Sequence, residues 1–133
     1  MSLVFKDDID SDDQPSGYTD SPEFEQRKEG IITQLFEING QISTLQQFIT
    51  SLEGLLHKGN VNAKVVENID KRSVVNIRKV GGLIKEVNEL VHKINKIEES
   101  DLDKTQLIAR EKILRDVQYS LKEFQSTQLH YTN

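Results

Sequence analysis

Residues 35–49 of the chain are Leu35-Phe36-Glu37-Ile38-Asn39-Gly40-Gln41-Ile42-Ser43-Thr44-Leu45-Gln46-Gln47-Phe48-Ile49. Leucine or isoleucine occupies positions 35, 38, 42, 45 and 49, so the apolar residues recur at alternating three- and four-residue steps. The same spacing continues outward to Ile31, Leu52 and Leu56. It is typical of an α-helix that packs along its length against other helices. The stretch holds no obvious nucleophile, metal ligand or phosphate-binding loop, so it predicts a packing or binding surface.

The composition favours one domain built from a few long helices. The chain has 133 residues, of which 35% are hydrophobic and 29% charged, and it has no Trp. This length corresponds to a single domain, and the low apolar content suits a small helical bundle with much solvated surface. The absence of Cys excludes disulfides and thiol catalysis and fits a cytosolic protein. The sequence contains neither a signal peptide nor a run of about 18 apolar residues that could span a membrane.

The net charge of −5 is concentrated at the start of the chain. Residues 1–20 contain six Asp against the single Lys6, whereas the remaining residues carry equal numbers of acids and bases. An acidic segment on a neutral body argues against nucleic acid as a partner. Because residues 1–20 lack a helical period, we expect a disordered acidic tail. The tail acts either as a solubilising leader or as a docking motif that uses Val4, Phe5 and Ile9.

The remainder, 21–133, is expected to form three long helices at about 22–58, 63–97 and 101–131. Ser21 and Pro22 are suited to begin the first helix, and Gly59 is suited to end it. Ser100 is the expected cap of the third helix, with Asp103 three residues later. Gly40 interrupts the first helix, which indicates either close approach of a neighbouring helix or a functional kink. Gly81-Gly82 raises the same alternatives of bending or tight packing in the second helix.

Short turns between long helices make neighbouring helices antiparallel. The fold class is therefore all-α, as an up-down-up antiparallel three-helix bundle. The expected core rows lie at Val66, Ile77, Val80, Ile84, Val87, Val91 and Ile94 in the second helix and at Leu107, Leu114, Val117, Leu121, Phe124 and Tyr131 in the third. Asp70 and Ser73 interrupt the former row.

Catalytic, metal and cofactor chemistry have little support in the sequence. Glu89 and His92 have the Glu-x-x-His spacing of di-iron bundles, but that chemistry needs two such motifs and further glutamates. Only one copy is present. We therefore expect no enzyme, no metal and no cofactor.

A basic line is the most distinctive charge pattern. Lys64, Lys71, Arg78, Lys85 and His92 lie seven residues apart, on the outer side of the second helix, and residues 63–97 carry a net charge of +4. The line indicates an acidic partner helix, an anionic membrane surface or simply a solvated helix face. Phe36 also falls at an outward position of the first helix. Two interpretations are open for Phe36: an exposed phenylalanine would mark a contact site, whereas curvature of the bundle would bury it.

Several blocks resemble the fungal endosomal (prevacuolar) syntaxins. The blocks are Ser21-Pro22-Glu23-Phe24, residues 35–48, 63–67, 70–74, 81–85, 103–112 and 115–120, and together they span about 21–128. The resemblance implies an N-terminal Habc domain, which in the family precedes a linker, a SNARE motif and a C-terminal membrane anchor. These elements are absent from the sequence, so we expect a soluble fragment of a longer, membrane-anchored Qa-SNARE.

The resemblance also implies a function in binding. The parent protein would act in vesicle fusion, on the cytosolic face of endosomal, prevacuolar or vacuolar membranes. Its implied partners are its own SNARE motif, held between the second and third helices, other SNARE proteins and a Sec1/Munc18-type protein. Residues 5–9 do not match the N-terminal peptide that some syntaxins offer to Sec1/Munc18-type proteins. The alternative function is a generic helical adaptor or tether that binds acidic partners or anionic membrane through the basic line.

Overall fold

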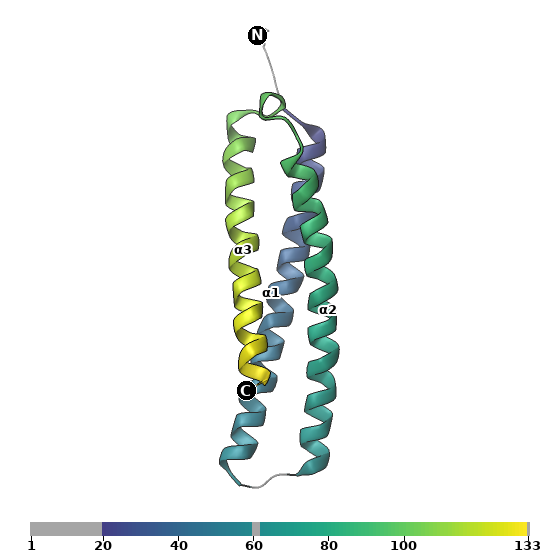
Figure 1. The fold of residues 1–133 in the computed structure, drawn as a ribbon, viewed down its shortest axis with the longest axis vertical. Helices are drawn as coiled ribbons and strands as arrows, with labels where there is room; N and C mark the ends of the chain where they lie inside the picture. The colour runs from purple at the N-terminus through teal and green to yellow at the C-terminus, as the bar shows by residue number, and fades with distance from the viewer. Residues whose placement is uncertain (1–19, 60–61, 133) are drawn as a thin grey trace, which may run out of the picture.

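The computed structural model describes residues 20–59 and 62–132, and these form three long helices. They are α1 (Pro22–His57), α2 (Ala63–Asn95) and α3 (Lys104–Thr132), with a short 3-10 turn η1 (Glu99–Asp101) before α3. The helices lie along one long axis and alternate in direction, so that α1 runs down, α2 up and α3 down in the view of Figure 1. The prediction of an all-α three-helix bundle is confirmed. The expected disordered tail lies outside the described residues, apart from Asp20.

The ends of the first two helices follow from their capping residues. The Ser21 hydroxyl accepts a hydrogen bond of 3.1 Å from the Phe24 amide, with Pro22 in the first turn, where no N–H is needed. Gly59 follows α1 with φ of 68°, a left-handed conformation that glycine adopts without strain. Asn62 caps α2, and its side-chain oxygen accepts from the Lys64 amide at 3.0 Å.

The third helix begins three residues later than expected, and Ser100 does not cap it. Ser100 lies within the 3-10 turn, and the Asp103 carboxylate accepts from the Gln106 amide at 2.7 Å. The Gln106 side-chain oxygen accepts in return from the Asp103 amide at 3.3 Å, which completes a capping box. Leu102 is buried against the core, so the chain must fold across the end of the bundle before α3 starts.

The central helix α1 supplies half of the buried apolar side chains. Its contribution is Phe24, Ile31, Leu35, Ile38, Ile42, Leu45 and Ile49, which confirms the spacing expected of residues 35–49. The other core residues are Val80, Val87, Ile94, Leu102, Ile113, Val117 and Phe124. Burial of this apolar surface is the main term that stabilises the bundle.

The expected core rows of α2 and α3 are only partly correct. Half-buried residues make up one side of each row: Ile77, Ile84 and Val91 in α2, and Leu107, Leu114, Leu121 and Tyr131 in α3. Polar side chains take buried places instead, namely Ser73 and Asn76 in α2, and Gln106, Ser120 and Thr127 in α3. Of these residues the apolar spacing singled out only Ser73, as an interruption of the row, because spacing does not show which polar side chains bond across helices.

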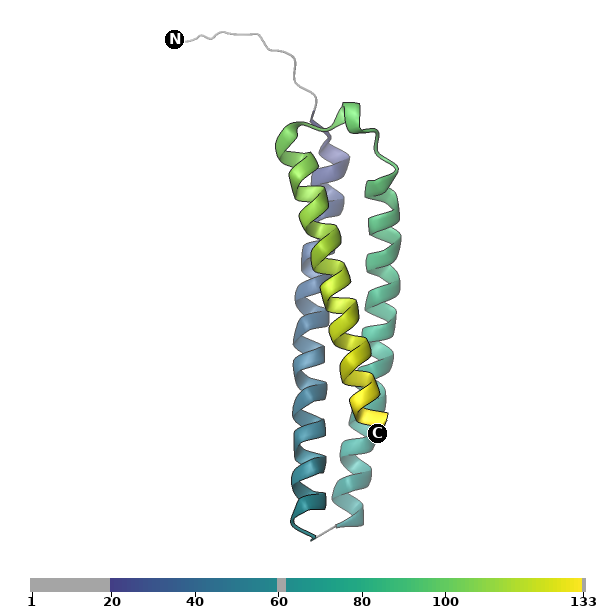
Figure 2. The same ribbon diagram turned by 60° about the vertical axis from the view of Figure 1, so that its left-hand side comes forward.

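The three helix pairs are unequal. Both α2 and α3 pack mainly on α1, and their contact with each other is the smallest of the three. The hairpin end formed by α1 and α2 extends beyond the end of α3 in both views (Figures 1 and 2). The bundle is therefore complete over only part of its length.

Gly40, Gly81 and Gly82 are not sites where another helix comes close. A Cβ at Gly40, Gly81 or Gly82 would meet no atom within 4 Å. The interpretation of these positions as close-packing sites is therefore wrong. Gly30 differs, because a Cβ there would lie 3.2 Å from Leu90 Cδ1.

Candidate functional site

The basic line lies on the outer face of α2. Lys64, Lys71, Arg78, Lys85 and His92 are all exposed. They recur once every two helical turns, so they lie along one side of the helix, away from buried Val80, Val87 and Ile94. Among residues 20–59 and 62–132, none of these five side chains takes part in a salt bridge within 4.0 Å.

Phe36 is 83% exposed, as expected for an outward position. Ile32, one turn earlier, is also largely exposed. Asn39 and Gln46, two polar residues of the same stretch, contact α3. The Ser120 hydroxyl donates to Asn39 Oδ1 at 2.8 Å, and Gln46 Nε2 donates to Thr127 Oγ1 at 3.4 Å. Phe36 differs from these two residues, because no contact in the described part of the chain explains why a phenylalanine stands at this exposed position.

A row of half-buried apolar side chains follows the boundary between α2 and α3. We call it the α2–α3 face, and its residues are Ile77, Ile84, Val91, Leu107, Leu114 and Leu121. At one end, Arg110 donates to the carbonyl oxygens of Ile94 and Ile97 at 3.2 and 3.0 Å. At the other end, the Tyr131 hydroxyl donates to Asp70. Ile77, Ile84 and Val91 follow Asp70 at seven-residue steps. Leu107 and Leu114 lie three residues before and four residues after Arg110, so the row lies on the sides of α2 and α3 that face each other.

A cluster of polar groups centred on Gln106 joins the start of α1 to the start of α3. The buried Gln106 amide accepts from the Ser21 N–H at 3.1 Å and donates to the Ser21 carbonyl at 3.2 Å. It also donates to Glu25 Oε2 at 2.8 Å. Hydrogen bonds from Lys28 and then from Gln106 lower the pKa of Glu25. These contacts are structural, because every group in the cluster is satisfied within the protein.

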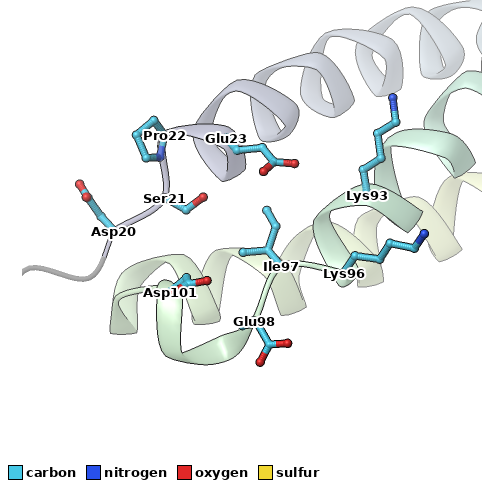
Figure 3. A pocket seen from close by; sticks show the side chains of 9 residues that line it. All are labelled: Asp20, Ser21, Pro22, Glu23, Lys93, Lys96, Ile97, Glu98 and Asp101. Carbon is cyan, nitrogen blue, oxygen red and sulfur yellow. The ribbon is translucent and has the colours of Figure 1, made fainter.

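A hollow beside this cluster has no chemistry of its own. Its walls come from the start of α1, the end of α2 and the connection that leads from α2 to α3 (Figure 3). The lining residues are Asp20, Ser21, Pro22, Glu23, Lys93, Lys96, Ile97, Glu98 and Asp101. It is open and lined by charges of both signs, so it selects neither cations nor anions.

The described histidines also form no candidate metal site. Glu89 and His92 are exposed, and among residues 20–59 and 62–132 no group of three or more His, Asp or Glu is placed to hold a metal ion. His130 Nε2 lies 2.8 Å from a Glu53 carboxylate oxygen on the surface, where it joins α3 to α1.

Comparison with known proteins accounts for the bundle. Residues 27–133 match the family model described as syntaxin-like protein. Syntaxin PEP12 of Saccharomyces cerevisiae is 58% identical over 117 residues, which is 88% of this chain and 41% of that protein. The chain belongs to the syntaxin-like family. It spans less than half the length of this relative, and no solved structure matches it.

Membership of the syntaxin-like family confirms the resemblance and the prediction that the chain is not an enzyme. None of the helices that the structure describes is long and apolar enough to cross a membrane. The predicted contact residues Lys64, Lys71, Arg78, Lys85 and Phe36 are all exposed, but they lie on two different helices. Their roles in binding stay predictions.

Two features of this syntaxin-like bundle were missed from the sequence. Val75 is 63% exposed and lies beside the basic line. Gln106 is almost fully buried. The Val75 environment was detectable, since cations occupy positions three and four residues to either side of it. The role of Gln106 was not, because its partners are 81 and 85 residues away.

Proposed function

We propose that this chain is the N-terminal Habc regulatory domain of a syntaxin-type SNARE and controls SNARE assembly by binding. Its ligand would be the SNARE motif of the same protein, held as a helix against the α2–α3 face. The single observation that carries this proposal is the row of six half-buried apolar side chains on α2 and α3, the two helices with the smallest mutual contact.

The chemistry of the face suits an amphipathic helix. Three residues on each side, at seven-residue spacing, match the a/d repeat of a coiled-coil segment. Full burial of a Leu or Ile side chain contributes about 1.5–3 kcal/mol, so completing six half-buried side chains contributes roughly 5 kcal/mol. Much of this is offset by lost freedom on association. The expected contact is therefore weak and reversible, as a regulatory domain requires.

The wider setting of the proposal comes from the family. We infer that the parent protein acts in vesicle fusion on endosome- or vacuole-bound routes and carries its SNARE motif and membrane anchor outside this chain. Other SNARE proteins and a Sec1/Munc18-type protein are its further proposed partners. The identity with syntaxin PEP12 supports this setting.

Methyl NMR on the bundle tests the proposed contact. We would add the SNARE segment of the full-length protein to a sample with labelled Ile, Leu and Val methyl groups. The expected shifts occur at Ile84, Val91 and Leu114, while exposed Val75 on the outer face of α2 serves as an internal control. Shifts absent at 1 mM peptide, or confined to Val75, would overturn the proposed site.

A further inference from the structure

A basic patch surrounds one exposed valine on the outer face of α2. Lys71, Arg72, Arg78 and Lys79 lie four and three residues before Val75 and three and four residues after it. On a helix these are the four nearest surface neighbours of a side chain. We call these five residues the α2 basic patch. Val75 is 63% exposed, so the patch presents one apolar side chain within reach of four cations.

The charge of the patch is mostly unbalanced by the bundle. Lys79 lies 3.4 Å from a Glu37 carboxylate oxygen, and both side chains are about half exposed. Lys71, Arg72 and Arg78 have no carboxylate within 4.0 Å among the described residues. The patch therefore offers at least three cations and an apolar contact to a ligand that is acidic and carries an apolar residue.

We propose that the occupant of the α2 basic patch is the acidic segment 7–13 of the same chain. Its sequence is Asp-Asp-Ile-Asp-Ser-Asp-Asp, so Ile9 has Asp8 and Asp10 on either side and three further Asp nearby. This composition is the complement of Val75 among four cations. Residues 1–20 also carry the whole net charge of the chain. The segment and the patch therefore carry opposite charges, and each contributes one apolar residue.

The length of the linking segment allows this contact. The Asn76 side chain donates to the Gln41 carbonyl oxygen at 2.9 Å, so Val75 lies at the level of Gln41 on α1. Gln41 is 20 residues from Ser21, which is about 30 Å along a helix. Ile9 precedes Ser21 by 12 residues, which reach about 40 Å when extended. Ile9 can therefore meet Val75 without displacing any helix.

Cations also lie along the route between these points. The chain enters α1 at Asp20 and Ser21, beside Lys93 and Lys96 from the end of α2 (Figure 3). From there toward Val75, the outer face of α2 carries Lys85 and, seven residues farther toward the start of the helix, Arg78. The hollow at the entry also holds Glu23, Glu98 and Asp101, so it serves as part of the route and not as the binding site.

The contact should be electrostatic and sensitive to salt. Exposed ion pairs contribute about 0.2–1 kcal/mol each, but a short covalent link gives an effective concentration in the millimolar range. Charges on the protein surface are screened strongly at about 0.5 M salt. Under ordinary conditions the acidic segment would compete with outside acidic ligands for the patch. This proposal does not depend on the SNARE motif binding at the α2–α3 face.

A spin label provides a direct test, because the chain has no cysteine of its own. Ser11→Cys would carry a nitroxide, and amide signals of the full chain would be recorded. The expected result is broadening centred on residues 71–79, lost at about 0.5 M NaCl. Uniform broadening, or broadening centred on another helix, would overturn the proposal.

Charge reversal supplies the matched comparison. Lys71→Glu/Arg78→Glu should abolish the broadening. Arg115→Glu/Lys122→Glu makes the same charge change at the same spacing on exposed positions of α3, and it should leave the broadening intact. Equal loss with both variants would show that net charge alone is responsible, and the proposed site would then be wrong.

Vesicles distinguish the proposed occupant from a membrane. Flotation with phosphatidylserine-containing vesicles would compare the full chain with a chain that starts at Asp20. Stronger binding of the shortened chain, lost with Lys71→Glu/Arg78→Glu, is expected if the acidic segment covers the patch. Equal binding of both chains through Lys71 and Arg78 would identify an anionic membrane as the occupant and overturn the proposal.

Discussion

Gln106 shows how a single buried side chain can join two helices. It is 3% exposed and connects Ser21, Glu25 and Asp103 through its amide group. Apolar neighbours make these bonds stronger than they would be in water, and they also raise the penalty for leaving a partner unsatisfied. The start of α1 and the start of α3 therefore depend on one residue.

We expect Gln106→Ala to destabilise the bundle by about 2 kcal/mol, because it leaves the Ser21 N–H without a partner, whereas the Ser21 carbonyl keeps its bond from the Glu25 amide. Urea unfolding followed by circular dichroism measures this loss. Gln125→Ala is the matched control, since Gln125 is an exposed glutamine on the same helix, and its effect should stay below about 0.5 kcal/mol. Equal effects of the two variants would contradict the structural role of Gln106.

Residue by residue, the sequence predicted the surface better than the buried polar groups. The outward positions of Phe36 and of the basic line follow directly from helical spacing. Asn76 could not be assigned in this way, because an amide inside an apolar period has the same appearance as an interruption. It is 5% exposed and donates to Gln41 at 2.9 Å, and its own side-chain oxygen has no partner among the described residues. The role of Asn76 becomes clear only when the position of α1 beside α2 is known.

At the scale of the helices, α1 is the element whose packing the sequence describes most fully. Its buried face consists of apolar residues at regular steps, so the period determines the face. In α2 and α3, small polar side chains share the buried face with Val and Ile, and a broad apolar stripe includes residues on both sides of the true centre. Prediction of the helices was therefore accurate. Each predicted row contained buried core residues, but it also included half-buried residues on the side of the α2–α3 boundary and left out the buried polar residues.

Gly40 provides a test at this scale. It lies on a helical backbone with open space where a Cβ would be, so Gly40→Ala should stabilise the protein by about 1 kcal/mol through helix propensity alone. Gly30→Ala is the matched control, because its Cβ would lie 3.2 Å from Leu90 Cδ1 and some of the gain would be lost. Thermal unfolding of both variants measures the difference. Destabilisation by Gly40→Ala would show that the residue is needed for a kink.

For the molecule as a whole, the unequal helix pairs separate stability from binding. The α1 core holds both other helices, and this leaves the α2–α3 face incompletely covered and the outer face of α2 free. The two proposed ligands would therefore occupy different sides of α2. Binding at either side adds contacts without requiring the core to open.

The hairpin end is the part of the molecule with the least support. Beyond the contacts of Glu53 with His130 and of Asp70 with Tyr131, α1 and α2 continue without α3 beside them (Figure 2). Leu56 and Val65, on the two arms of this end, are exposed, and a pair of helices buries less apolar surface than a triplet does. Local opening of this end should require much less free energy than global unfolding.

Amide hydrogen exchange followed by NMR measures this difference. Residues 54–58 and 65–68 should exchange at least ~10-fold faster than the amides around Leu45, Val80 and Val117, which lie in the three-helix region. Val87→Ala, a buried truncation, should speed exchange in the three-helix region while the hairpin end changes little, because that end already opens locally. Uniform protection along α1 and α2 would instead mean that the two helices unfold only together with α3.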